Sequence, residues 1–259
     1  MELSLATLPQ QLYGLNKVGI VGMPPLTVIG ELNRQGIIIH DLDEPLVRVD
    51  IEAASPFLPS VYCAILRTAV VNALHLDLDA IFIDTGPGKC DCALHTATIL
   101  ADALPIPVIP TSNTDSRGYG IPLCRARMDL VSRMRAITAG VKSAAPHAGT
   151  PPPCRPMAGF WGVPPRDFSI LELFPDATHI YGWTRCMENK TPADHALETS
   201  CNHQVPTVFF AQSFCAKTAL ARYLARKHPQ ALYLDADLHT GGSARAKIQA
   251  FLELSGVAR

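Results

Sequence analysis

The segment LDAIFIDTGPGKCD, residues 78–91, decides the fold class. Its first half is a near-continuous apolar run that ends at Asp84. Such a run predicts a strand whose two faces are both covered, as in a parallel sheet. A Gly- and Pro-rich loop, 85–90, follows, and residues 91–104 then place apolar side chains at helical spacing. Strand, loop and helix in this order predict one unit of an α/β fold.

The same pattern continues on both sides of this segment. It predicts strands at 18–22, 36–40, 106–110, 178–183, 206–212 and 231–235, and helices at 60–76, 123–139, 216–228 and 243–254. No sustained internal repeat is evident. The stretch SAAPHAGTPPPCRP, 143–156, disfavours helix and central strand because its prolines fix φ. We therefore expect two Rossmann-like lobes with mainly parallel sheets flanked by helices: 1–142, a Pro-rich linker at 143–158, and 159–259.

Composition excludes several classes of partner. The 259 residues carry a net charge of -1, so the chain has no basic excess with which to neutralise phosphates. Neither nucleic acid nor a membrane is expected as a partner, and no apolar stretch is typical of a membrane span. The N-terminus lacks the basic start of a signal peptide, which indicates a cytoplasmic protein with reduced cysteines. The oligomeric state stays open, a homodimer included.

Four of the eight cysteines follow predicted strands within a few residues. Cys90 and Cys92 come after the strand that ends at Asp84, Cys186 after 178–183, and Cys215 after 206–212. Functional loops of parallel α/β sheets lie at the carboxyl ends of the strands. If the two lobes face each other, these thiols meet at one edge of the fold.

Thiolates at such an edge could hold an iron–sulfur cluster, of the [4Fe–4S] type, or another soft metal, with zinc as the alternative. Cys154, in the linker, could replace one of the four ligands. Cysteines can equally be small buried hydrophobes, as expected for Cys63 and Cys124. The Cys90–Cys92 pair also suits a redox dithiol, because the N-terminus of the following helix should lower the pKa of both thiols.

A second group of residues combines both tryptophans with charged side chains in predicted loops. It comprises Trp161, Arg166, Trp183, Arg185 and Lys190. Rigid aromatics beside charges suit the recognition of a planar or anionic small-molecule substrate. Packing between the domains, with the charges solvated, explains the same pattern.

Two other patterns are weaker. Lys217 and Thr218 follow a strand as in a phosphate-binding loop, but QSFCAKT lacks the glycines that let a backbone wrap a phosphate. Asp84, Asp115 and Asp235 could be acid/base groups, or caps of neighbouring helices.

The end of the chain, from TVFFAQSFCAKT to AKIQAFLEL, resembles the closing lobe of the 2-hydroxyacyl-CoA dehydratase and benzoyl-CoA reductase family. The elements that carry the resemblance are 209–215, 216–228, 232–237 and 247–253. LDAIFIDTGPGKCD, followed by IPVIPTSNTD, is similar to the preceding strand–cysteine unit of that family, so about half the chain is covered. The resemblance implies a [4Fe–4S] cluster between two Rossmann-like lobes, with Cys90 and Cys215 as ligands and Cys186 as the next choice.

The leading hypothesis is an oxygen-sensitive iron–sulfur or thiolate-metal protein of anaerobic metabolism. It would act as an oxidoreductase or reductive lyase in a low-potential step on a small molecule, or in electron transfer to a redox partner protein. A non-catalytic metal carrier or maturation factor is the first alternative. A degenerate nucleotide-binding protein is the second.

Overall fold

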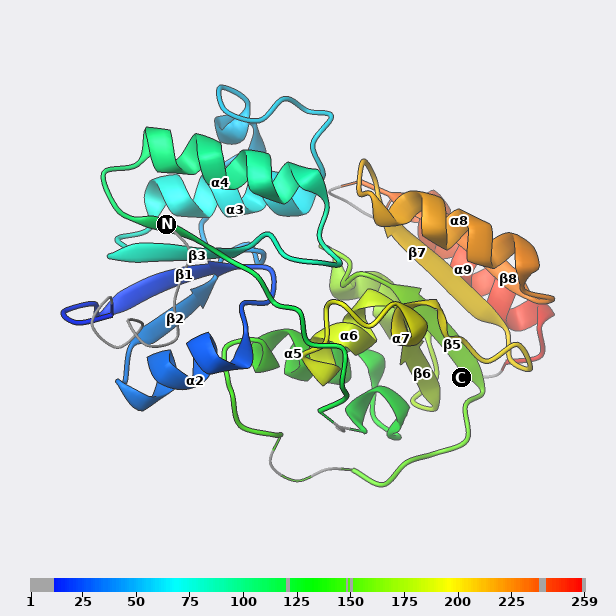
Figure 1. Cartoon of the computed structure of the whole chain (residues 1–259). Coiled ribbons are helices and arrows are strands. Elements are labelled where there is room, and N and C mark those ends of the chain that lie inside the picture. Colours follow the sequence, from blue (N-terminus) through cyan, green and yellow to red (C-terminus); the bar gives the residue numbers. More distant parts are fainter. Residues whose placement is uncertain (1–11, 120–121, 148, 150, 238–240, 258–259) are drawn as a thin grey trace. The chain divides into compact units, whose positions relative to one another are not determined.

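The computed structural model describes residues 12–119, 122–147, 149, 151–237 and 241–257. The chain forms two compact units, each built on one four-stranded parallel sheet flanked by helices (Figure 1). This arrangement confirms the predicted α/β fold with two Rossmann-like lobes. The first unit contains residues up to 117 together with 141–146 and 190–193, and the second contains 118–140, 147–189 and the chain from 194 onward.

The sheet of the first unit has the strand order β2-β1-β3-β4, with every pairing parallel. Its strands are β1 (Lys17–Val21), β2 (Ile38–Asp41), β3 (Ala80–Asp84) and β4 (Val108–Thr111). All five residues of β3 are buried, as its unbroken apolar run predicts. Helix α2 (Leu26–Arg34) lies on one face of the sheet, and α3 (Ala64–His75) and α4 (Asp91–Ala103) lie on the other (Figure 1). The short helix η1 (Ile51–Ala54) packs against α3.

Helix α2 was not expected from the sequence, because Pro24 and Pro25 suggest a loop. Pro25 in fact stands at the N-cap of the helix, where a missing backbone N–H costs nothing. Val28, Ile29 and Leu32 then form the buried stripe that holds the helix on the sheet. The proline pair therefore marks where the helix begins.

The second unit repeats the topology with the strand order β6-β5-β7-β8, again all parallel. Its strands are β5 (Ala158–Gly162), β6 (Thr178–Tyr181), β7 (Thr207–Gln212) and β8 (Ala231–Ala236). Its helices are η2 (Leu123–Arg125), α5 (Leu130–Gly140), η3 (Phe168–Leu173), α6 (Trp183–Asn189), α7 (His195–Thr199), α8 (Lys217–Lys227) and α9 (Gly242–Leu254). None of the helices in the described part of the chain combines the length and apolar character needed to cross a membrane.

The central strand β5 was missed by the sequence analysis, which interpreted residues around Trp161 as a recognition loop. That interpretation is wrong for Trp161, which is fully buried in β5. Its ring lies 5.9 Å from the ring of Phe209, and its Nε1–H donates a hydrogen bond to the carbonyl of Glu198 at 2.9 Å. The indole is therefore a core side chain with its one polar atom satisfied.

The two units also share a sequence pattern at their central strands. VGIVGMPP, 18–25, and AGFWGVPP, 158–165, both read G-x-x-G-x-P-P and both occupy the first strand of a unit and the turn after it. The turn glycines, Gly22 and Gly162, have φ values of 73° and 155°, which L side chains rarely adopt. The pattern is short, which explains why no sustained repeat is visible along the chain.

The compact units divide the chain at several places. Helix α5, expected in the N-terminal lobe, lies in the second unit, and residues 141–146 return to the first. Asn33 fixes this return, because its side chain bonds the backbone of Lys142 and Ala144 at 3.0 Å each. The Pro-rich stretch then pairs with the second unit through a bridge between Ala126 and Pro153.

Candidate functional site at the carboxyl ends of the first sheet

The carboxyl ends of β1 and β3 mark the point where the chain direction across the first sheet changes. From β1 the chain continues to β2 on one side, whereas from β3 it continues to β4 on the other. The loops after these two strands therefore diverge, and ligands of open α/β sheets bind at such points. The residues that meet here include Gly22 after β1, Asp84 at the end of β3 and Asp43 after β2.

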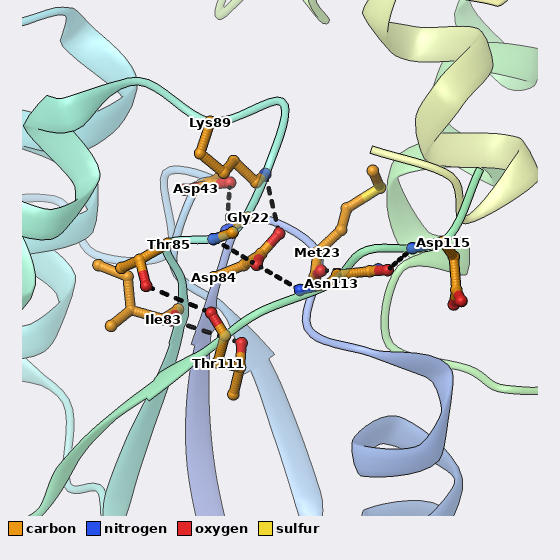
Figure 2. A network of polar contacts seen from close by, with 11 residues as sticks. Gly22, Met23, Asp43, Ile83, Asp84, Thr85, Lys89, Thr111, Asn113 and Asp115 are labelled. Carbon is orange, nitrogen blue, oxygen red and sulfur yellow. Dashed lines mark hydrogen bonds and ion pairs between the residues drawn. The ribbon is translucent and has the colours of Figure 1, made fainter. Parts of the chain in front are cut away.

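Asp84 is the centre of the polar network in Figure 2. Its Oδ1 accepts hydrogen bonds from the backbone N–H of Gly86 at 3.2 Å and of Asn113 at 3.1 Å. Its Oδ2 lies 3.8 Å from the ammonium of Lys89. One buried carboxylate thus fixes both ends of the loop from Thr85 to Lys89 and joins it to the segment after β4.

Asn113 extends the network to the turn after β1. Its side-chain N–H donates to the carbonyl of Met23 at 3.1 Å, and its Oδ1 accepts from the backbone N–H of Asp115 at 3.0 Å (Figure 2). Asn113 itself is buried, whereas Asp115 is exposed. The three segments that follow β1, β3 and β4 are therefore held as one piece.

Lys89 occupies the space that the absent side chain of Gly22 leaves open. A Cβ at Gly22 would lie 2.5 Å from Nζ of Lys89. The backbone N–H of Gly22 donates to Oδ2 of Asp43 at 3.0 Å, which brings a second carboxylate to this position (Figure 2). A glycine here both allows the positive φ and lets the ammonium approach the backbone.

Burial governs the ionisation of the acidic groups at this edge. It raises the pKa of Asp84 and of Asp43, and the Lys89 ammonium opposes both shifts. The pKa of Asp41 is raised well above its ordinary value, first by burial and then by the negative charge of Asp43. The edge thus gathers three carboxyls whose protons are held more tightly than in water.

Cys90 and Cys92 follow directly on this anchored loop. Cys90 is the N-cap of α4 and Cys92 lies in its first turn, and both side chains are half-buried. The pKa of Cys92 is raised, mainly by burial and then by the neighbouring Cys90 thiol. The expectation that the helix N-terminus lowers the pKa is therefore wrong for Cys92. The two thiols are two positions apart at the junction of the loop and α4.

The other predicted ligands lie in the second unit and differ in accessibility. Cys215, just after β7, is half-buried. Cys186 lies inside α6 and not on a loop, is fully buried, and has a thiol 3.8 Å from the carbonyl of Asp194. Burial, followed by the charge of Glu198, raises its pKa to about 12. Cys154 is half-buried, with its sulfur 3.8 Å from Nε2 of His179.

No cluster of three or more His, Cys, Asp or Glu side chains suited to a metal ion occurs among residues 12–119, 122–147, 149, 151–237 and 241–257. Cys63 and Cys124 are buried, as expected, although they lie at the start of α3 and in η2 and not within long helices. Within the first unit, Cys90 and Cys92 place two thiols at the start of α4.

The predicted substrate-binding residues are less exposed than their composition suggests. Trp183 and Lys190 are buried, and Arg166 and Arg185 are half-buried. The ammonium of Lys217 lies over the ring of Trp183, 4.5 Å from the ring centroid. Burial lowers the pKa of Arg166. Of the five predicted residues, only Arg166 and Arg185 therefore expose an appreciable part of their surface.

The phosphate-binding interpretation of Lys217 and Thr218 gains no support from their contacts. Lys217 forms an ion pair with the buried carboxylate of Glu198, and the hydroxyl of Thr218 donates to the carbonyl of Gln212 at 3.2 Å. Both side chains would have to leave these partners to reach a phosphate.

Sequence reasoning missed Asp43, Asn113 and Glu198. Each is polar, well buried or half-buried, and joined to a partner far away in the chain. Only the position of Asp43, just after a predicted strand, offered a signal. A search against models of known families and a search of curated proteins each found no match to this chain.

Proposed function

We propose that this protein is a thiolate-metal protein, with an iron–sulfur cluster as the bound group, and that Cys90 and Cys92 supply two of the ligands. Its role would be a low-potential reductive step on a small molecule or electron transfer to a partner protein. The observation that carries the proposal is the pair of half-buried thiols, two positions apart at the start of α4, on the anchored loop that follows β3.

The donor set suits a soft metal, since two thiols one residue apart at a helix start can bind the same ion. The polar network supports them in a way that metal sites require, because it fixes the loop that carries the ligands. Asp84 holds this loop at Gly86 and at Lys89. Gly88 adds a further constraint, because a Cβ there would lie 1.9 Å from the carbonyl oxygen of Pro192.

Proton release should accompany binding. Both thiols must lose their protons to become ligands, and the pKa of Cys92 is raised. Metal affinity is therefore expected to increase with pH. A bound cluster would supply an electron at low potential, while the residues of this chain orient the sulfur ligands.

Two alternatives use the same chain differently. A metal carrier or maturation factor would bind through the same two thiols and would release the metal to a partner without turnover. The resemblance to the 2-hydroxyacyl-CoA dehydratase family favours a redox role, and it also nominates Cys215 and Cys186 as further ligands. Cys215 is the more accessible of those two.

Anaerobic reconstitution with iron and sulfide tests the proposal. We expect visible absorption from sulfur-to-iron charge transfer and an EPR signal after reduction by dithionite. Cys90→Ser and Cys92→Ser should each abolish or strongly reduce the bound iron and sulfide. Cys201→Ser is the matched control, because Cys201 is also half-buried but belongs to no predicted ligand set. It should leave the iron content unchanged.

The outcome also separates the alternatives. Zinc bound in place of iron, and lost in the same two variants, would keep the thiolate-metal proposal and replace the cluster. Iron content that is identical in wild type, Cys90→Ser and Cys92→Ser would overturn it. Cys215→Ser and Cys186→Ser then show which thiols of the second unit take part.

A further inference from the structure

A groove of about 810 Å³ lies between α8 and β8 in the second unit. On α8 it is lined by Ala219, Arg222 and Arg226, which are spaced by three and four positions and so share one helix face, and Cys215 lines it just before the helix. On β8 it is lined by Tyr233 and Asp235, which are two positions apart and so share one strand face.

The shape of the groove follows from small residues. Ala216 and Ala219 line it beside larger neighbours, and the absence of longer side chains there leaves room between the helix and the strand. Helix α8 packs on both β7 and β8 (Figure 1). The helix and strand β8 supply the two walls of the groove. Its volume is in the range of sites for small molecules.

The charges of the groove favour an anion. Arg222 and Arg226 are exposed and one helical turn apart. Within the described part of the chain, neither guanidinium lies within ion-pair distance of a carboxylate. The one acidic group, Asp235, accepts hydrogen bonds from Ser213 at 2.6 Å and Tyr233 at 3.4 Å. The groove is thus lined by two cations and by one carboxylate that already accepts two hydrogen bonds.

We propose that this groove is a binding site for a planar small molecule that carries an anionic oxygen group, a carboxylate or a phosphate. The guanidiniums of Arg222 and Arg226 bind the anion, because their forked N–H groups match such oxygen pairs. The rings of Tyr223 and Tyr233 contact the planar part. The thiol of Cys215 stands at one end of the site, beside the bound molecule.

Calorimetric titration of the metal-free protein with 2-naphthoate and with 2-naphthyl phosphate tests this site. One equivalent of at least one anion should bind, and neutral 2-naphthamide should bind at least about tenfold more weakly. The double variant Arg222→Gln/Arg226→Gln should lose at least about tenfold in affinity. The control Arg135→Gln/Lys247→Gln removes the same charge from exposed positions outside the groove and should bind as wild type does.

A second measurement locates the ligand. Alkylation of Cys215 by iodoacetamide, followed by peptide mass spectrometry, should slow when the bound anion is present, while alkylation of Cys201 should not change. Cys215→Ser should keep its anion affinity. A preference between the two anions identifies the group that the site takes.

Three results would overturn the proposal: no binding of either anion, equal binding of the neutral amide, or unchanged affinity in the double glutamine variant. Thermal unfolding of each variant shows whether it is folded. Because the experiment uses protein without metal, its outcome is independent of metal binding by Cys90 and Cys92.

Discussion

The two units share a strand order and a turn sequence but place different chemistry at the carboxyl ends of their central strands. In the first unit, polar side chains gather there around Asp84 and Lys89, and two half-buried thiols follow. In the second, the buried rings of Trp161 in β5 and Phe209 in β7 pack against each other, and Cys186 is fully buried. Each unit also pairs a lysine with a buried carboxylate, Lys89 with Asp84 and Lys217 with Glu198.

The two units thus combine the same strand order with different side chains near the ends of their central strands. The glycine and proline pattern recurs in both units, whereas the buried side chains near the strand ends differ: polar groups around Asp84 in the first unit and the rings of Trp161 and Phe209 in the second. Fold similarity between the units is therefore no guide to shared function. The following changes test the contrast, from the largest expected effect to the smallest.

Trp161→Ala should be the most destabilising change. It removes a fully buried ring and leaves the Glu198 carbonyl without its indole donor. We expect a loss of about 3–5 kcal/mol in the free energy of unfolding, measured by urea denaturation. Tyr223→Ala, at an exposed ring, is the control and should change stability little. Similar losses for both would show that the edge of the second unit is not a packed core.

Lys89→Met tests the polar edge of the first unit. Burial raises the pKa of Asp84 above 3.8, so the folded state binds this proton more tightly than the unfolded state. The stability that this proton contributes is present at low pH and is lost as pH rises through the folded-state pKa. Lys89→Met removes the cation that opposes this shift and so raises the folded-state pKa of Asp84 further. The loss of stability in the variant should therefore increase with pH.

The size of that effect can be measured by urea unfolding. We expect a loss of about 3 kcal/mol near neutral pH and a clearly smaller loss at about pH 4.5. Lys17→Met is the control, because Lys17 pairs with the exposed Asp77 and should show no comparable pH dependence. If Lys89→Met lowers the free energy of unfolding equally at both pH values, the ionisation of Asp84 does not depend on Lys89.

Thiol reactivity should distinguish the edges directly. Cys90 is half-buried, whereas Cys186 is fully buried and has its pKa raised to about 12. We therefore expect iodoacetamide to modify Cys90 at least about tenfold faster than Cys186 near pH 8, because the thiolate is the reactive form. Peptide mass spectrometry at successive times measures both rates. Equal rates would contradict the assigned burial of Cys186.

Gly22→Ala compared with Gly36→Ala isolates the contact with Lys89. Both glycines have φ near +70°, but a Cβ at Gly36 meets nothing within 4 Å, whereas one at Gly22 meets Lys89. Backbone strain should cost about 1 kcal/mol at each position, with about 1 kcal/mol more at Gly22. Thermal and urea unfolding of the two variants give this difference, and equal losses would exclude a close approach of the ammonium to Gly22.

The sequence predicted most strands because their apolar runs are bounded by Gly and Pro. It failed at β5, where AGFWG carries two glycines and follows a run of prolines, so local preference points away from a strand although tertiary packing imposes one. Trp161 was therefore assigned to a loop. The Cys90–Cys92 pair could be located from its position after β3, whereas the burial of Cys186 could not, because α6 begins directly at Trp183.

The partners in the polar network lie beyond local sequence rules. Asp84 bonds Asn113, 29 positions away, and Asn113 bonds Met23, 90 positions away. No spacing rule relates such residues, since their proximity depends on the strand order. The domain boundary at 143–158 stays a prediction, although the compact units show a more discontinuous division.

Residues 190–193 belong to the first unit, although the ribosome adds them long after the rest of that unit. The carbonyl of Pro192 packs against Gly88, beside the loop that leads to Cys90. During translation, this contact cannot form until well over half of the polypeptide has left the ribosome exit tunnel. A truncation at the end of the predicted N-terminal lobe would therefore leave the cysteine loop without one of its supports. The two units are best expressed and purified as a single polypeptide.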